Sequence, residues 1–228
     1  SPHQELEIVS VLTQFKGQVK KELVNVSSIP SYFRGLFYVL DKGKYSSDDS
    51  PRILTLAHSS LCYLVKRVAM QCPSFLEDKG TVTELIIHLF LLGTHGSVHL
   101  EGRNFWISST RALEAIQLIE PFKVQDCILE LLKDGSLQRR KILLVMDEVL
   151  QISEKAQTSD VRQDLWGKFV LALLELLNNE NDNENDNLGP LACDIILKNE
   201  KNKTELRHWI SLLNRKTHRD LLSVSLDQ

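Results

Sequence analysis

The sequence has few of the residues that build disulfide frameworks, and it lacks the apolar runs that span membranes. Its four cysteines are scattered, and no two of them form a CxxC pair. The first residues do not have the pattern of a signal peptide, so we expect none, and the sequence has no apolar run of transmembrane length. We therefore expect buried thiols in a reducing compartment. The chain opens Ser-Pro-His without a methionine, so we expect a domain of a larger parent protein.

An excess of charge of one sign is also missing. The 27 Lys and Arg residues face 30 Asp and Glu residues, which gives a net charge of −3 and a pI near 6.2. Bulk charge therefore gives no support for nucleic-acid or anionic-membrane binding, and we expect neither partner. Attraction to an acidic protein would need a local basic patch.

No segment shows the alternation of polar and apolar residues that is typical of strands. Apolar residues instead recur at intervals of three and four, which predicts helices. Proline and glycine mark where many of these helices begin or end. The predicted fold class is all-α, with helices over residues 5–19, 30–43, 52–71, 82–92, 104–120, 124–133, 137–154, 160–177, 188–198 and 204–222.

The predicted helices form pairs at a spacing of roughly 35–50 residues, which is typical of HEAT or armadillo arrays. We predict one α-solenoid domain over residues 1–228, with a globular helical bundle as the alternative. Residues 178–187, NNENDNENDN, contain no apolar side chain and predict a mobile loop. This acidic, Asn-rich loop is either a contact site or a tolerated surface insertion.

The segment HSSLCYLVKRVAMQCPS, residues 58–74, predicts one helix that ends at Cys72-Pro73. His58 and Cys62 lie one turn apart on it, so they could share a metal or act as a nucleophile with its base. No partner ligands stand at a useful spacing, and nothing beside the pair supplies an oxyanion hole. A packed histidine next to a buried thiol is the simpler interpretation.

The other polar clusters are weaker signals. His95, His99 and Glu101 lie in a glycine-rich segment that matches no phosphate-binding motif. Asp147 and Glu148 are neighbours on a helix, so their side chains point about 100° apart. The three tryptophans lie within apolar stripes and are expected in the core. We therefore expect no enzymatic activity, no metal and no cofactor.

Basic residues recur near the turns within the predicted helix pairs. Turns within the repeats of a stacked array line up along one edge, so these residues would form one positive stripe on an acidic protein. Each residue alone is also explained by its place near a helix end. The residues are Lys20, Lys21, Lys66, Arg67, Lys123, Lys155, Arg162, Lys201 and Lys203.

Two long segments carry a family resemblance. LTQFKGQVKKELVNVSSIPSYF (12–33) and LAHSSLCYLVKRVAMQCP (56–73) resemble the N-terminal region of the budding-yeast-type CLASP proteins, which are microtubule-associated proteins of the spindle. The resemblance implies the first TOG-like domain, a paddle of HEAT-like helix pairs that holds tubulin by one narrow edge. The chain is short for the full set of pairs, so we expect the last pair to be reduced or missing.

The resemblance implies a partner-binding edge rather than a catalytic site. By position, Lys20, Lys21, Val24 and Asn25 correspond to its first turn. The remaining residues assigned to the edge are Lys66, Arg67, Lys123, Lys155 and Arg162. Tubulin-binding TOG domains usually present a tryptophan in the first turn, whereas this chain has KKELVNVSS there.

Two partners follow from these features. The first is a kinetochore protein, with the basic edge targeting the parent protein to kinetochores of the spindle. The second is the tubulin heterodimer or the microtubule lattice. A nuclear and cytoskeletal location is implied by either, and dimerisation of the parent protein through regions outside this chain stays open. If charge reversal of the edge leaves binding unchanged, the alternative is an aromatic surface near Tyr32 and Tyr45.

Overall fold

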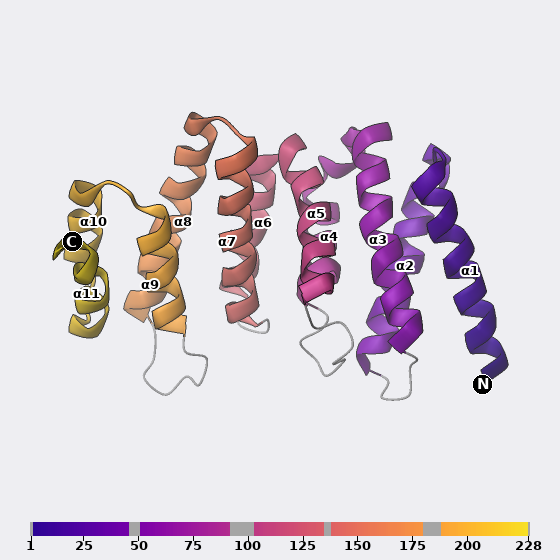
Figure 1. Cartoon of the computed structure of the whole chain (residues 1–228), viewed down its shortest axis with the longest axis horizontal. Coiled ribbons are helices and arrows are strands. Elements are labelled where there is room, and N and C mark those ends of the chain that lie inside the picture. The colour runs from indigo at the N-terminus through magenta and orange to yellow at the C-terminus, as the bar shows by residue number, and fades with distance from the viewer. Residues whose placement is uncertain (1, 46–50, 92–102, 135–137, 180–187, 228) are drawn as a thin grey trace. The chain divides into compact units, whose positions relative to one another are not determined.

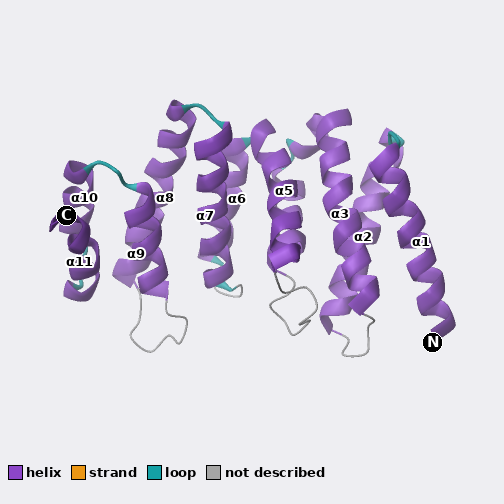
Figure 2. Ribbon diagram, viewed as in Figure 1, coloured by secondary structure: helices purple, strands orange, loops and turns teal. Residues whose placement is uncertain are grey.

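The protein is described by a computed structural model that covers residues 2–45, 51–91, 103–134, 138–179 and 188–227. These residues are almost entirely helical and contain no strand, as Figure 2 shows, so the all-α prediction is confirmed. The α-helices are α1 (Pro2–Lys21), α2 (Ile29–Tyr45), α3 (Pro51–Gln71), α4 (Lys79–Ile86), α5 (Arg103–Ile119), α6 (Pro121–Lys133), α7 (Arg139–Ala156), α8 (Ser159–Asn179), α9 (Leu188–Asn199), α10 (Lys203–Ser211) and α11 (Lys216–Ser223) (Figure 1). Short 3₁₀ turns follow α1, α3 and α11, and a π-helical segment, Ile87–Leu91, continues α4.

The chain divides into two compact units, Ser1–Cys127 and Ile128–Gln228. In the first unit α3 packs against α1, α2 and α5, and in the second α9 packs against α7, α8 and α11. Each unit is therefore a stack of successive helices, as in HEAT-like repeats, and the predicted α-solenoid class is confirmed. One domain over the whole chain stays a prediction.

Hydrogen bonds between successive repeats give the repeat length in the first unit. The Val24 amide donates to Gln71 Oε1 at 2.9 Å, 47 positions along the chain. Arg67 Nε reaches the Val19 carbonyl across 48 positions, and Cys127 Sγ reaches the Lys79 carbonyl across 48. The bonds thus recur at about the length of one HEAT repeat, within the predicted spacing.

The helix α3 is the core helix of the second repeat. The side chains of Ala57, Leu61, Leu64, Val65 and Val68 are fully buried, and their spacing of three and four places them on one face. The helix ends at Gln71, and Pro73 then opens a 3₁₀ turn. The predicted bounds of this helix, residues 52–71, differ from the observed ones by one residue.

The predicted helix over residues 204–222 is wrong, because the chain breaks into α10 and α11 between them. Asn178 Nδ2 donates to the Leu212 carbonyl at 3.0 Å, and the Asn214 amide donates to Asn178 Oδ1 at 2.9 Å. The Arg219 guanidinium donates to the carbonyls of Leu213 and Asn214. These side chains satisfy the backbone groups that a continuous helix would have paired internally.

Two further predictions concern the loop at residues 178–187 and the absence of a membrane-spanning helix. The predicted loop at residues 178–187 lies outside the described residues, except for Asn178 and Asn179 at the end of α8. The helices that the structure describes include none that is long and apolar enough to cross a membrane.

Candidate functional site

The first turn of the predicted edge follows α1 and is fixed by local hydrogen bonds. Asn25 Oδ1 accepts from the Ser27 amide at 3.1 Å and from the Ser27 hydroxyl at 2.8 Å, and so caps the 3₁₀ turn. Val24 is only 5 % exposed. Of the residues predicted here for partner binding, Val24 and Asn25 thus shape the turn, while Lys20 and Lys21 are exposed.

The C-terminal end of α3, which belongs to the second repeat, forms hydrogen bonds that hold this first turn in place. Arg67 Nε donates to the Val19 carbonyl at 3.0 Å, and Arg67 Nη2 donates to the Lys20 carbonyl at 2.8 Å. The side-chain amide of Gln71 bonds both the amide and the carbonyl of Val24. The Arg67 guanidinium therefore satisfies two carbonyls at the C-terminal end of α1, where a cation also suits the helix dipole.

Replacing Arg67 with alanine is expected to lower the free energy of unfolding by about 1–2 kcal/mol, because two charge-assisted hydrogen bonds are lost at a half-exposed position. Lysine in its place keeps the charge but lacks the planar fork, so most of this loss should remain. Urea unfolding followed by circular dichroism measures both variants. Lys21→Ala, at an exposed position, is the control, and an equal effect of the two alanine variants would contradict a bracing role.

Three lysines surround one tyrosine beside the first turn. Lys20 Nζ and Lys66 Nζ each lie 4.5 Å from the centre of the Tyr63 ring, and Lys16 Nζ lies 5.8 Å from it. The pKa of the Tyr63 phenol is lowered, first by a hydrogen bond from Lys20 and then by the charges of the lysines. This set, Lys16, Lys20, Tyr63 and Lys66, is called the lysine cluster below. Lys16 and Tyr63 were not among the predicted site residues.

Exposed apolar side chains accompany the positive charge at the first turn. Leu23 is 69 % exposed, and Val26 in the 3₁₀ turn is 51 % exposed. Met70, the neighbour of the bracing Gln71, is 75 % exposed. Apolar groups flanked by lysines are typical of a surface that binds a protein partner.

The second turn shows the same bracing by the repeat that follows. Lys123 Nζ, in the first turn of α6, donates to the Glu77 carbonyl. Asp78 caps α4 by accepting from the Thr81 amide at 2.9 Å, and the pKa of its carboxyl is lowered by its bonds to Thr81 and by the Lys123 charge. Lys123, a predicted partner-binding residue, therefore also holds the second turn in place.

The predicted residues of the second unit lie near the turn between α7 and α8. Lys155, in the last turn of α7, is exposed, and Arg162 is half-buried near the start of α8. Arg162 lines a cavity of about 170 Å³ together with Trp166, Lys201 and Asn202. Both units thus carry basic residues at their turns, and the continuous stripe stays a prediction.

His58 and Cys62 form a buried polar contact rather than a reactive centre. His58 Nε2 lies 2.9 Å from the Ser109 hydroxyl and 3.2 Å from the Leu89 carbonyl, and Cys62 Sγ lies 3.9 Å from His58 Nδ1. Burial lowers the pKa of His58 to about 4 and raises the pKa of Cys62 to about 12. A neutral imidazole and a neutral thiol are the forms that a packed core favours.

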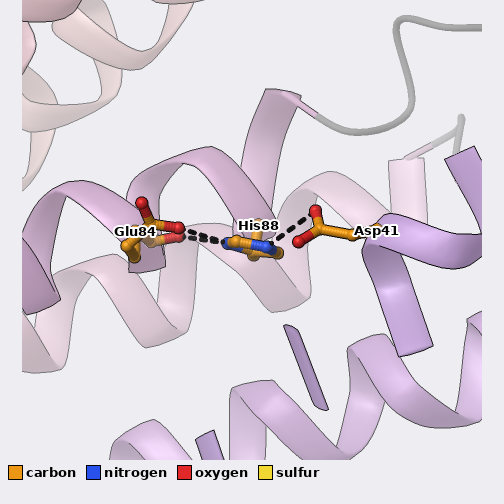
Figure 3. Close-up of polar contacts among 3 residues, drawn as sticks. All are labelled: Asp41, Glu84 and His88. Carbon is orange, nitrogen blue, oxygen red and sulfur yellow. Dashed lines mark hydrogen bonds and ion pairs between the residues drawn. The ribbon is translucent and has the colours of Figure 1, made fainter. Parts of the chain in front are cut away.

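A second histidine ties α2 to the segment that follows α4, as Figure 3 shows. His88 Nε2 lies 3.0 Å from Asp41 Oδ1, and His88 Nδ1 lies 2.6 Å from the Glu84 carbonyl oxygen. Both ring nitrogens of His88 therefore face oxygens that accept hydrogen bonds. Across the described ranges no three such side chains are grouped as metal ligands. The contact is therefore a structural tie beneath the Phe37 ring, whose centre lies 4.1 Å from that of His88.

The remaining predicted candidates lie at half-buried positions, along one groove, or outside the described residues. His95, His99 and Glu101 lie outside the described residues. The three tryptophans are expected in the core from the sequence, but Trp106, Trp166 and Trp209 are half-buried and none belongs to the fully buried set. The alternative aromatic surface contains a groove of about 500 Å³ between α1 and α2, lined by Ile8, Val11, Phe15 and Tyr32 among others, whereas the side chain of Tyr45 is not described.

Comparisons with known proteins identify relatives of this chain. It is 34 % identical over 175 residues to Protein STU1 of Eremothecium gossypii, a match that covers 76 % of this chain and 11 % of the relative. It is 36 % identical over 149 residues to Protein STU1 of Kluyveromyces lactis, covering 63 % of this chain and 10 % of the relative. The matched segment is therefore about a tenth of each relative's length.

No family model matches the sequence, and no solved structure matches it. A third relative, Protein STU1 of Debaryomyces hansenii, is 31 % identical over 53 % of this chain and 7 % of the relative. The STU1 proteins are yeast CLASP homologues, and the matches agree with the resemblance carried by residues 12–33 and 56–73. The chain is therefore a domain of the CLASP family.

Proposed function

We propose that the chain is a non-enzymatic, protein-binding domain of a microtubule-associated CLASP protein, and that its basic edge binds a kinetochore protein and so targets the parent protein to kinetochores of the spindle. The observation that carries this proposal is the concentration of positive charge beside the first turn. Lys16, Lys20 and Lys66 converge on Tyr63 there, next to the exposed Lys21. An acidic protein surface complements such a patch.

A second candidate partner is the tubulin heterodimer or the microtubule lattice. Leu23 supports it, because this apolar side chain is 69 % exposed in the turn where tubulin-binding TOG domains usually present a tryptophan. A leucine buries less apolar area than a tryptophan, so a weaker contact is expected. The acidic surface of tubulin would also attract Lys20 and Lys21.

Sedimentation velocity with unpolymerised tubulin, at low and moderate salt, separates the two partners. A salt-sensitive complex of one chain per heterodimer would support the tubulin candidate. Absence of a complex at low salt would exclude unpolymerised tubulin as a partner. Capture of purified kinetochore particles on the immobilised chain then tests the first candidate directly.

Reversing two charges of the edge, Lys20→Glu with Lys21→Glu, is expected to weaken binding of either partner at least tenfold, because like charges would then face each other across the interface. The matched control is Lys168→Glu with Lys216→Glu, which makes the same change in net charge at exposed positions of the second unit. Equal binding by the edge variant and the control would show that the first turn is not part of the interface.

A further inference from the structure

We propose that the lysine cluster is a binding site for a phosphate monoester on a partner peptide, that is, for a phosphoserine or phosphothreonine side chain. This inference rests on the proposed function, because Lys20 and Lys66 belong to the edge assigned to partner binding. It adds the chemical group that the edge recognises, and it places Lys16 and Tyr63 in the site.

The cluster is built by the packing of α1 against α3. Lys16 and Lys20 are four positions apart on α1, so both project from one face of that helix, and Tyr63 and Lys66 are three positions apart on α3. The two faces meet with Lys20 Nζ and Lys66 Nζ at 4.5 Å and Lys16 Nζ at 5.8 Å from the Tyr63 ring centre. Three ammonium groups thus converge on a single ring.

Among the described residues, no carboxylate pairs with the lysines of the cluster. Across the described residues, Lys16, Lys20 and Lys66 form no ion pair with a carboxylate, whereas Lys198 pairs with Asp147 at 3.0 Å. The facing phenol offers these lysines only the negative face of its ring and its oxygen. Three like charges gathered round one ring repel one another, and an anion bound among them would offset that repulsion.

A phosphate monoester fits this arrangement better than a single carboxylate. It carries a charge of about −1.5 to −2 at pH 7 and three terminal oxygens that accept hydrogen bonds. Each oxygen can accept from one ammonium group, and the Tyr63 hydroxyl provides a further donor. A carboxylate brings one charge and two oxygens, so it would leave part of the cluster unpaired. Lysine ammonium groups on flexible stems can close around a tetrahedral group.

The test uses two synthetic peptides and a signal from Tyr63 itself. An alanine-rich peptide with one central phosphothreonine, and the same peptide with glutamate in that place, are titrated into the chain carrying ¹³C-labelled tyrosine rings. The chain contains four tyrosines, and Tyr63→Phe identifies the signal of Tyr63 by its loss. We expect the phosphopeptide to shift the Tyr63 signal to saturation. The glutamate peptide should need an at least tenfold higher concentration to reach the same shift.

Variants then assign the site to the cluster. Lys16→Gln and Lys66→Gln are each expected to weaken phosphopeptide binding about tenfold, because each removes one charge-assisted hydrogen bond. Lys168→Gln removes the same charge at an exposed residue of α8, outside the edge and the cluster, and should change the affinity less than twofold at physiological salt.

Three results would overturn the proposal. They are an unshifted Tyr63 signal at the highest phosphopeptide concentration, equal binding of the glutamate peptide, and an equal effect of Lys168→Gln and Lys16→Gln. A different result would contradict the proposed function, namely unchanged partner binding after charge reversal at Lys20 and Lys21. Partner binding that is lost with that reversal but unaffected by Lys16→Gln would keep the proposed function and remove the phosphate site.

Discussion

Replacing Phe90 with alanine is expected to lower the free energy of unfolding by about 3–5 kcal/mol, the largest effect that we predict for a single substitution. Phe90 lies in the π-helical segment after α4 and is fully buried. Its ring packs edge-on against Trp106, with ring centres 5.0 Å apart and an interplanar angle of 67°. Alanine would therefore leave a cavity and remove an aromatic contact.

Chemical denaturation followed by circular dichroism measures this loss. Leu118→Ala is the control, because Leu118 is apolar but 52 % exposed. This substitution should lower the free energy of unfolding by less than about 0.5 kcal/mol. A loss below about 1 kcal/mol for Phe90→Ala would mean that the segment between α3 and α5 is not tightly packed.

Acidification from pH 7 to pH 4 is expected to remove about 3 kcal/mol of stability through His58 alone. The pKa of His58 is about 4 in the folded chain, against an ordinary value of 6.5. The unfolded chain therefore binds the proton first as the pH falls. The contribution is fully present above pH 6.5 and is lost as the pH falls toward 4.

Burial is the reason why the folded chain resists this proton, because it penalises the charged imidazolium, whereas the hydrogen bond to the Leu89 carbonyl raises the pKa of His58 and offsets only part of the effect. The Ser109 hydroxyl donates to the Leu89 carbonyl at 2.7 Å, and His58 Nε2 faces the same two oxygens and must be the donor. The other nitrogen, Nδ1, then carries no proton, and the Cys62 sulfur lies about as near to it, at 3.9 Å, as to Nε2, at 3.8 Å. Protonation of Nδ1 would place a charge in the core.

The His58 contribution is isolated by comparing the wild type with His58→Gln across pH. The difference between their free energies of unfolding should shrink by about 3 kcal/mol between pH 7 and pH 4. Leu118→Ala, which removes no titratable group from an exposed position, should leave the pH dependence unchanged. A constant difference between wild type and His58→Gln would contradict the assignment.

Local periodicity was sufficient to predict the long helices of this chain. The apolar positions of α3, from Ala57 to Val68, recur at three and four because the helix buries one face, and Pro73 ends it. The break between α10 and α11 has no such local sign, since LLNRKT contains neither glycine nor proline. It depends on Asn178, which lies 34 positions before Leu212.

The candidate site could be predicted only in part for the same reason. The turns and their basic residues follow from where helices end, and the spacing of Lys16 from Lys20, and of Tyr63 from Lys66, already places each pair on one helical face. That these two faces meet is a property of tertiary packing. The bracing role of Arg67 likewise requires the carbonyls of α1, which no sequence pattern displays.

The bracing of the first two turns by the repeat that follows each of them limits how short a folded fragment of the edge can be. Val24 is held by Gln71, and Glu77 by Lys123, so both turns depend on residues that belong to the next repeat. A fragment that ends after α2 would contain the whole first turn but would lack Gln71 and Arg67, which fix its shape. The smallest module that can present the first turn in its folded form therefore extends from α1 to the end of α3.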